Sequence, residues 1–339
     1  MSVTSDRHLL DADPKPAAVG VTAPSNAPGL AAEHRDAILE RETATPPPPA
    51  ETPFRRFLSD FLESRVATAA VVALAAIILL AVLAPFIVPQ NPYDLAQVDM
   101  LDNKLPPGSA GSAGYTYWLG TDGAGRDLLS AILYGLRISL SVGVLSGFAA
   151  LTIGVAVGLL AAYAGGRVET MIMRIVDLQL SFPAVLVALM LVAVLGRGVD
   201  KIIIALILVQ WAYYARTVRG NALVERRKDY VEAARCLGLS RNRIVFRHIL
   251  PNCLAPLIVV ATVQTAHAIA LEATLSFLGV GLPQTEPSLG ALIANGFAYM
   301  TSGLYWISIF PGIALLITIV TINLVGDQLR DVLNPRLSR

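Results

Sequence analysis

Long apolar segments recur from residue 66 onward, and they decide what this sequence can fold into. A helix that crosses the hydrocarbon core of a bilayer needs about 20 mostly apolar residues. The stretch 66–88 reaches this length without a single charged residue. Five further apolar stretches follow at 138–163, 171–195, 199–215, 253–280 and 304–325. The sequence therefore predicts an all-α membrane protein with six transmembrane helices.

The composition agrees with a membrane protein and argues against other classes. Hydrophobic residues make up 55% of the 339 residues and charged residues only 15%, against about 25% charged residues in soluble domains. The formal net charge of +1 lacks the basic excess of a nucleic-acid-binding protein. Cys236 and Cys253 form no Cys-x-x-Cys pair, so neither a zinc site nor a disulfide framework is indicated, and we expect no bound metal.

Sequence signatures of two large enzyme classes are missing. The chain has no Gly-x-x-x-x-Gly-Lys-Ser/Thr motif, the loop that cradles nucleotide phosphates. It also has no Gly-x-Ser-x-Gly motif, the nucleophile turn of many hydrolases. We therefore expect no enzymatic activity and no cofactor in this chain, so that any energy it uses comes from a partner.

Composition divides the chain into three parts. Residues 1–53 contain nine prolines, four of them consecutive, and such a segment buries too little apolar surface to fold. We predict a disordered Pro-rich tail at 1–53, a first transmembrane helix with its connecting loop at 54–135, and a core of five transmembrane helices at 136–339.

Lys and Arg are unevenly distributed, and this asymmetry predicts the orientation of the chain. The segment 216–251 holds nine Lys and Arg residues against three acidic ones, whereas 89–135 holds two against five Asp residues. Short loops rich in Lys and Arg face the cytoplasm. The segment 216–251 is therefore predicted to be cytoplasmic and 89–135 extracytoplasmic, and six spans then place both termini in the cytoplasm.

Polar residues inside the predicted spans are candidates for a functional role because burying them in lipid is costly. Gln264, His267 and Glu272 are candidate pathway-lining residues of the fifth span, although interhelical hydrogen bonds are the simpler explanation for His267 and Glu272. Asp177 follows Arg174 by three residues, a spacing that predicts an ion pair within one helix.

Two other patterns predict local packing. Glycines at positions 143, 147, 154 and 158 make two small-x-x-x-small pairs in the second span, a spacing that lets helices approach closely. Asp122 and Asp127 follow glycines in the segment before that span, where they are predicted to cap a turn and a helix.

The segment 229–252 predicts a compact helix–turn–helix. Residues 229–237 favour a helix, Gly238 permits a left-handed turn, and Ser240 can cap a second short helix. The small residues of the first helix suit close docking of another protein. A basic loop that only sets topology or contacts anionic lipid is the alternative.

The order of residues in this segment resembles the EAA loop of ABC importer permeases. In that family the loop sits in a groove on the cytoplasmic ATPase subunit, so the resemblance implies a coupling role for the matching residues. These residues are Glu232, Ala233, Ala234, Gly238, Ile249, Leu250 and Pro251.

Further segments resemble the dipeptide/oligopeptide (and nickel) importer family, specifically its second permease subunit. They are residues 118–140, 161–183, 271–293 and 323–336. The resemblance covers about residues 54–339 and implies the type I ABC importer permease fold in a bacterial plasma (inner) membrane. It also implies a homologous second permease, two cytoplasmic ATPases that bind ATP and Mg²⁺, and an extracytoplasmic substrate-binding protein.

The function implied by the resemblance is ATP-driven import of dipeptides or oligopeptides. The same architecture importing nickel, glutathione or another small ligand is the first alternative. An ATP-independent carrier or channel is a second one, with Asp177 and Glu272 as the only candidates for a coupled ion site. A membrane receptor or scaffold without a transport role is the third.

Overall fold

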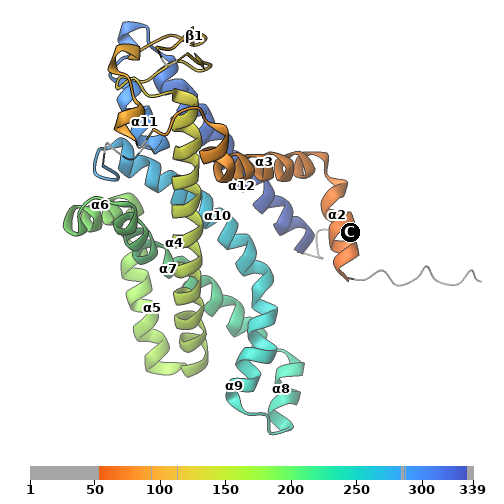
Figure 1. Ribbon diagram of the computed structural model, residues 1–339. Coiled ribbons are helices and arrows are strands. Elements are labelled where there is room, and N and C mark those ends of the chain that lie inside the picture. The colour runs from red at the N-terminus through yellow and green to blue at the C-terminus, as the bar shows by residue number, and fades with distance from the viewer. Residues whose placement is uncertain (1–52, 93, 113, 284–285, 287, 334–339) are drawn as a thin grey trace, which may run out of the picture. The chain divides into compact units, whose positions relative to one another are not determined.

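The computed structural model describes residues 53–92, 94–112, 114–283, 286 and 288–333 (Figure 1). The tail predicted at 1–53 lies outside the described residues except for Pro53, which begins the first described helix.

Helices make up most of the described structure. They are α2 (Pro53–Glu63), α3 (Arg65–Ile87), α4 (Leu128–Ala164), α5 (Gly166–Leu180), α6 (Ala184–Leu195), α7 (Val199–Glu225), α8 (Asp229–Cys236), α9 (Arg241–Ile244), α10 (Leu250–Phe277), α11 (Leu289–Phe297) and α12 (Trp306–Leu333). Single turns lie at η1 (Leu95–Gln97), η2 (Met100–Asp102) and η4 (Met300–Ser302), and η3 (Val245–Ile249) is a π-helical segment. Two short strands, β1 (Ser109–Ala110) and β2 (Thr116–Tyr117), pair antiparallel.

Five described helices are long and apolar enough to cross a bilayer. They are α3, α4, α7, the continuous stretch Arg241–Phe277, and α12. The number of membrane spans reaches six only if α5 and α6 together form one span. The axes of these two helices meet at a bend of 89°. The prediction of six apolar membrane segments therefore holds, but the third segment is not a straight helix.

The prediction of one continuous helix over 171–195 is wrong because of Pro183. Proline lacks a backbone N–H and disfavours the helical conformation at the residue before it. Accordingly, α5 ends at Leu180, and the carbonyl of Pro183 accepts the first hydrogen bonds of α6, from the N–H groups of Leu186 and Val187.

Several helices are longer than predicted, α4 and α7 most of all. Helix α4 begins at Leu128, where the Asp127 carboxylate accepts a 2.8 Å hydrogen bond from the N–H of Ser130. Helix α7 continues to Glu225, well past the last apolar residue of the predicted span. Apolar patterning reports only the length of helix that lies in lipid, so capped or charged extensions escape it. The boundary predicted between 135 and 136 consequently lies inside α4.

Close contacts through glycine hold α4 against its neighbours. A methyl group on Gly158 would lie 2.6 Å from the carbonyl oxygen of Ala215 and 2.9 Å from Cβ of Val218, both on α7. On the same helix, a methyl group on Gly143 would lie 2.7 Å from Cγ1 of Ile269 on α10. The close packing predicted from the glycine spacing is confirmed, and it places α4 in direct contact with both α7 and α10.

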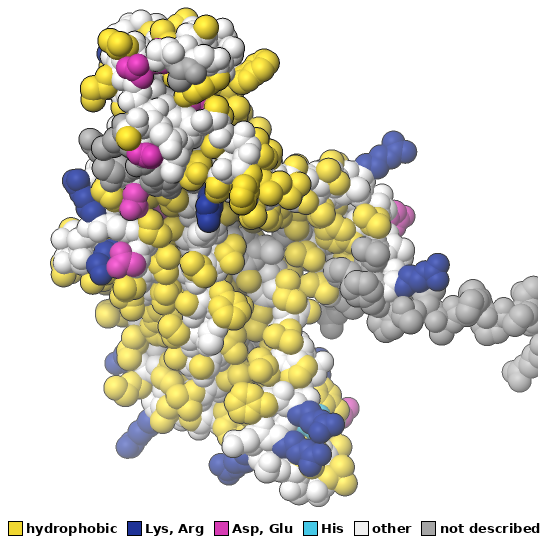
Figure 2. Space-filling model, viewed as in Figure 1, with side chains coloured by type: hydrophobic (Ala, Val, Ile, Leu, Met, Phe, Trp, Pro, Cys, Tyr) yellow, Lys and Arg dark blue, Asp and Glu magenta, His cyan; other side chains and the backbone are white. Residues whose placement is uncertain are grey.

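Apolar side chains cover much of the outer surface of the long helices (Figure 2). On α3, for example, Val72 is 63% exposed and Val82 is 61% exposed. Such a surface would be unfavourable in water but matches the hydrocarbon core of a bilayer.

We expect Gly158→Val to destabilise the protein by about 1–3 kcal/mol, because the added carbons have no space between α4 and α7. The matched control is Gly220→Val, since no atom lies within 4 Å of a methyl group placed there. Thermal unfolding of both variants in the same detergent measures the difference. Equal stability of the two variants would contradict the packing described for α4.

Candidate functional site

The predicted coupling residues lie in a small helical unit beyond the end of α7. We call residues 226–249 the α8–α9 unit. Figure 1 shows α8 and α9 at the opposite end of α4 from β1 and α11. Residues 216–225 of the predicted loop instead form the last turns of α7.

One face of α8 is anchored to the long helices. Val231 is fully buried and Ala234 is 4% exposed. They belong to one apolar cluster with Val218 of α7, Leu159 of α4 and Cys253 of α10. A displacement of α8 must therefore be transmitted to these helices, because a close-packed interior deforms little.

The turn between α8 and α9 forms as the sequence predicts. Gly238 has a φ of +72°, a left-handed conformation that strains any residue with a side chain. Its N–H donates to the carbonyl of Arg235 at 2.9 Å, and the N–H of Leu239 donates to that of Ala234 at 3.2 Å. Ser240 occupies the N-cap position of α9, although its side chain makes no capping hydrogen bond.

The end of the unit runs directly into the next span. Ile249 is buried, and Leu250 and Pro251 begin α10 without a break in the helix. Pro251 comes just after the π-helical segment Val245–Ile249, where the regular α-helical hydrogen-bond pattern is already interrupted. The α8–α9 unit is therefore rigidly joined to α10.

The other face of α8 is open. Glu232, Ala233 and Gly238 are exposed, and Leu237 is 79% exposed. On the following segment Phe246 is 64% exposed. Apolar side chains exposed beside small residues in a segment rich in Lys and Arg are typical of a protein-docking surface. The sequence reading did not identify Leu237 and Phe246, which stand out only as apolar residues within a basic segment.

A polar network that the sequence reading also did not identify ties α7, α8 and α10 together. The Glu225 carboxylate accepts hydrogen bonds from Lys228 Nζ at 2.6 Å and from the Tyr230 hydroxyl at 2.7 Å. The Asn252 amide donates to the Tyr230 hydroxyl at 3.2 Å. Partial burial, with the hydrogen bond to Glu225, raises the pKa of Tyr230 to about 12. The tyrosine thus remains a neutral donor at physiological pH.

Cationic side chains surround this open face. On the face seen in Figure 2, Lys and Arg side chains cluster over α8 and α9, whereas acidic side chains lie over the segment that carries β1. The arrangement matches the charge asymmetry predicted from the sequence.

Ion pairs between helices replace the pair predicted within α5. Asp177 contacts Arg216 of α7, so the predicted partner Arg174 is wrong. One helical turn along α7, Arg219 pairs with Glu169 of α5 at 2.5 Å. Local spacing permitted the Arg174 pair, but the packing of α5 against α7 brings another arginine closer.

The candidate pathway residues of α10 lie in different environments. Glu272 is fully buried and accepts 2.8 Å hydrogen bonds from the hydroxyls of Ser139 on α4 and Ser276. Within the described residues, the Gln264 amide nitrogen and His267 Nδ1 are buried without a hydrogen-bond partner. Glu272 thus links α4 to α10, whereas Gln264 and His267 keep unused hydrogen-bonding capacity.

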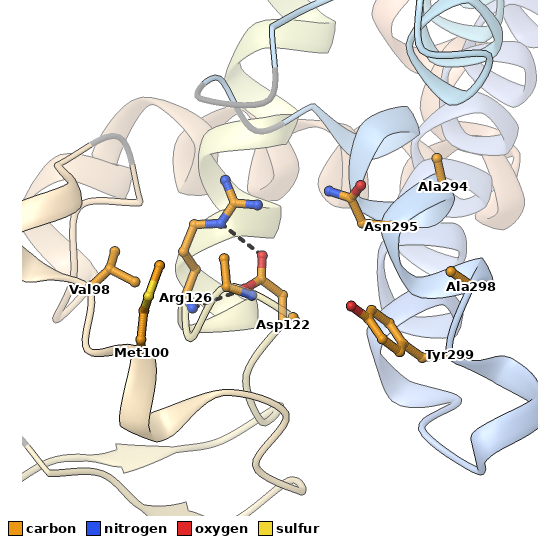
Figure 3. A pocket seen from close by; sticks show the side chains of 10 residues that line it. Val98, Met100, Asp122, Arg126, Ala294, Asn295, Ala298 and Tyr299 are labelled. Atoms are coloured by element: carbon orange, nitrogen blue, oxygen red, sulfur yellow. Dashed lines mark hydrogen bonds and ion pairs between the residues drawn. The ribbon is translucent and has the colours of Figure 1, made fainter.

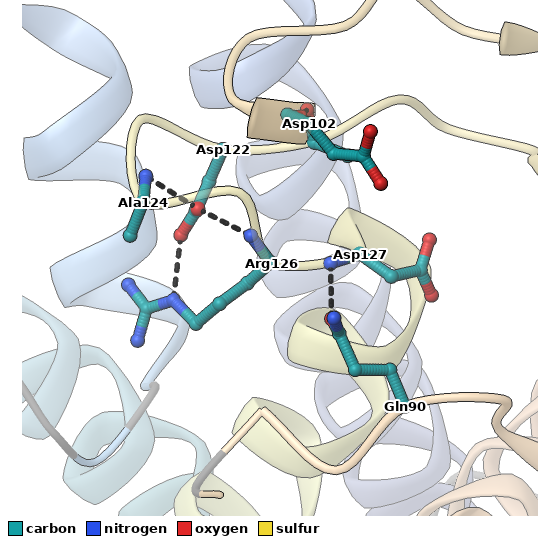
Figure 4. A network of polar contacts seen from close by, with 7 residues as sticks. Gln90, Asp102, Asp122, Ala124, Arg126 and Asp127 are labelled. Atoms are coloured by element: carbon teal, nitrogen blue, oxygen red, sulfur yellow. Dashed lines mark hydrogen bonds and ion pairs between the residues drawn. The ribbon is translucent and has the colours of Figure 1, made fainter. Parts of the chain in front are cut away.

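At the opposite end of α4, residues 89–127 form a polar connecting segment (Figure 4). Asp122 accepts hydrogen bonds from the N–H of Ala124 at 2.8 Å and from Nε of Arg126 at 2.8 Å. Gln90 accepts a 2.6 Å hydrogen bond from the N–H of Asp127. The predicted capping roles of Asp122 and Asp127 are confirmed.

A cavity of about 700 Å³ lies between this connecting segment and α11 (Figure 3). Met100, Asp122 and Arg126 line it on one side, and Asn295 and Tyr299 line it on the other. No group of three or more His, Cys, Asp or Glu side chains in the described part of the chain is placed to hold a metal ion.

We expect Asp102→Asn to destabilise the connecting segment by about 1–3 kcal/mol. Asp102 is 6% exposed and accepts 2.8 Å hydrogen bonds from the hydroxyls of Ser112 and Tyr117. Burial raises its pKa, but these bonds and the N–H of Ser112 outweigh burial and hold the pKa below its usual value. Stability from the carboxylate is therefore present above about pH 4 and is lost as the pH falls further.

Thermal unfolding of wild type and Asp102→Asn between pH 3 and pH 7 tests this expectation. The stability difference should be largest near pH 7 and should shrink on acidification, with the exposed Asp60→Asn as control. A difference that does not change with pH would show that the charge of Asp102 has no role in stability.

Comparisons with known proteins agree with this architecture. Residues 154–339 match the family model described as binding-protein-dependent transport system inner membrane component. Residues 52–107 match the model described as N-terminal TM domain of oligopeptide transport permease C.

Individual relatives cover most of the chain. A putative peptide transport system permease protein of Brucella suis is 45% identical over 78% of this chain and 86% of its own length. A glutathione transport system permease protein of Pectobacterium atrosepticum is 37% identical over 84% of this chain and 92% of its own. A di/tripeptide transport system permease protein of Pseudomonas aeruginosa is 36% identical over 84% of this chain and 93% of its own.

The fold also matches a solved structure. A chain from an inward-facing conformation of the MetNI methionine ABC transporter superposes with a TM-score of 0.52 and 23% identity, covering 61% of this chain and 98% of that chain. At this identity the match establishes the fold only. The chain belongs to the binding-protein-dependent transport system inner membrane component family and is a multi-pass membrane permease with the fold of an ABC importer permease.

Proposed function

We propose that this chain is a permease subunit of an ATP-driven importer of dipeptides or oligopeptides. The names of several relatives refer to peptide, dipeptide or di/tripeptide transport. A glutathione transport permease is 37% identical, close to the 36% and 34% of the di/tripeptide and dipeptide permeases, and glutathione is itself a modified tripeptide. Import of glutathione is thus the second candidate function.

The proposed transporter contains four further subunits. A second, homologous permease would complete the pathway, two cytoplasmic ATPases would bind ATP and Mg²⁺, and an extracytoplasmic binding protein would deliver the substrate. In this assembly the chain catalyses no reaction itself. The family description as an inner membrane component that depends on a binding protein supports this arrangement.

The coupling proposal rests on the two different faces of the α8–α9 unit. Its open face presents Ala233, Gly238 and Leu237, while its buried face anchors to α4, α7 and α10. When the ATPase dimer closes, its movement would displace the docked unit, and the anchored face would pass the displacement to the long helices. The remaining matching residues would shape the unit and fix its position: Glu232 and Ala234 on α8, and Ile249, Leu250 and Pro251 where the unit joins α10. In the two-state scheme of alternating access, this displacement shifts the pathway between inward-facing and outward-facing forms.

The proposed orientation places the α8–α9 unit in the cytoplasm. The clustering of Lys and Arg at this end and of acidic side chains at the other supports it. The connecting segment 89–127 and its cavity would then face the binding protein, both termini would be cytoplasmic, and the protein would reside in the bacterial plasma (inner) membrane. Gln264 and His267 remain our candidates for lining the pathway because they retain free hydrogen-bonding groups.

Uptake of a labelled dipeptide tests the substrate proposal. We expect the native gene to restore uptake in a deletion strain, and excess unlabelled longer peptides to compete. Glutathione and nickel serve as the other competitors. Restored accumulation of glutathione or nickel without any peptide uptake would keep the importer architecture and overturn the peptide assignment.

We expect Gly238→Val to insert normally but to lose coupling between ATP hydrolysis and uptake. Valine is strained at a φ of +72°, so the turn that sets α8 against α9 must change. Uptake should fall about tenfold or more if the altered turn costs the docked state about 1.4 kcal/mol. Gly220→Val, in open space on α7, is the control, with membrane levels checked by blot. Normal uptake by a fully inserted Gly238→Val protein would contradict the coupling role.

A further inference from the structure

Helices α10 and α12 pack together over several turns and enclose a groove beyond the last close contact. At the contact, a methyl group on Gly326 would lie 2.6 Å from Oγ1 of Thr262. From there toward the start of α10 and the end of α12, the helices enclose a groove of about 580 Å³. Figure 1 shows the two helices running apart in this direction.

The lining of this α10–α12 groove is apolar except at one position. Helix α10 contributes Ala255, Pro256, Val259, Val260 and Val263, and α12 contributes Leu333 and Arg330. The α10 residues extend from Ala255 to Val263, which is eight steps of about 1.5 Å, or about 12 Å of helix. The groove is thus a strip of hydrocarbon surface with a single cation beside it.

Arg330 faces the groove without a counter-ion. It makes no hydrogen bond or ion pair with any residue that the structure describes. Gly326, Arg330 and Leu333 share one face of α12 at helical spacing. Asp327 lies one turn before Arg330, about 60° around the helix, and Asp331 about 100°, but neither is paired with Arg330 and neither lines the groove. The cation is therefore directed to the groove, and the acids are not.

We propose that the α10–α12 groove binds an anionic phospholipid, with an acyl chain along α10 and the phosphate paired with Arg330. An apolar strip beside one unpaired guanidinium at the end of a membrane helix matches the two parts of such a lipid. Anionic headgroups attract Lys and Arg close to the membrane surface. Of the residues that line the groove, only Arg330 is charged or polar, which complements one phosphate beside an acyl chain.

The lipid would connect two elements with different roles. Helix α10 continues directly from the α8–α9 unit, whereas α12 packs against α11 at the other end of the molecule. A lipid wedged between α10 and α12 would therefore support the separation of these helices next to the proposed coupling unit.

Lipid retention by the purified, assembled transporter tests the proposal. The complex is extracted in mild detergent from membranes that contain phosphatidylglycerol and phosphatidylethanolamine, and both lipids are quantified by mass spectrometry. We expect Arg330→Gln to lower the ratio of retained phosphatidylglycerol to phosphatidylethanolamine about fivefold, the equivalent of about 1 kcal/mol for one arginine near the surface. Val259→Trp should fill the groove and lower retention of phosphatidylglycerol even with Arg330 present.

Matched controls separate the groove from general surface effects. Arg167→Gln removes an exposed cation at the start of α5, and Ile258→Trp adds the same bulk to an exposed position of α10. Neither should change the ratio. Arg330→Lys should retain most of the phosphatidylglycerol and serves as the charge variant if Arg330→Gln fails to assemble.

Two results would overturn the proposal. One is a phosphatidylglycerol ratio that is the same in wild type, Arg330→Gln and Val259→Trp. The other is a crosslink from Val259→Cys to the second permease, which would show that protein fills the groove. Neither result bears on the transported substrate, so the peptide proposal is tested separately by uptake.

Discussion

The close approach of α4 to α7 is the contact on which the described structure depends. Gly154 and Gly158 remove the side chains that would hold the helices apart, and the backbone of Ala215 fills the space. Helices in lipid gain little from apolar burial, since lipid is as apolar as they are. Close backbone contact, with its many dispersion interactions, is then the main attraction. Helix α4 also contacts α10 through Gly143, so three long helices are fixed relative to one another.

This arrangement explains how a small surface unit can act on the membrane helices. The α8–α9 unit is joined covalently to α7 and α10, and its buried face reaches Leu159 of α4. The Glu225–Tyr230–Asn252 network ties the end of α7 to the start of α10 through α8. A force on the exposed Leu237 would therefore act on all three helices at once, which is the property that the proposed coupling needs.

Interactions between helices account for what the sequence reading missed. Asp177 pairs with Arg216 because α5 lies against α7, although Arg174 is closer in sequence. For Glu272 the sequence favoured an interhelical hydrogen bond, but it did not name the partner, Ser139, which lies more than one hundred residues earlier in the chain. The exposed Leu237 and Phe246 could be recognised only after the buried members of the same unit had been identified. Pro183 was visible in the sequence, but its effect on the third segment was underestimated because apolar content alone defined that segment.

The sequence by itself determined the helical class, the apolar segments, the charge asymmetry, the glycine contact face and the turn at Gly238. Each of these follows from local rules: hydrocarbon thickness sets helix length, helical spacing sets faces, and a missing side chain permits a left-handed turn. Only the tertiary structure decided the partner of Asp177, the open face of α8 and the groove beside Arg330. These features depend on distances between residues far apart in the chain, which the packing of whole helices sets and local sequence does not specify.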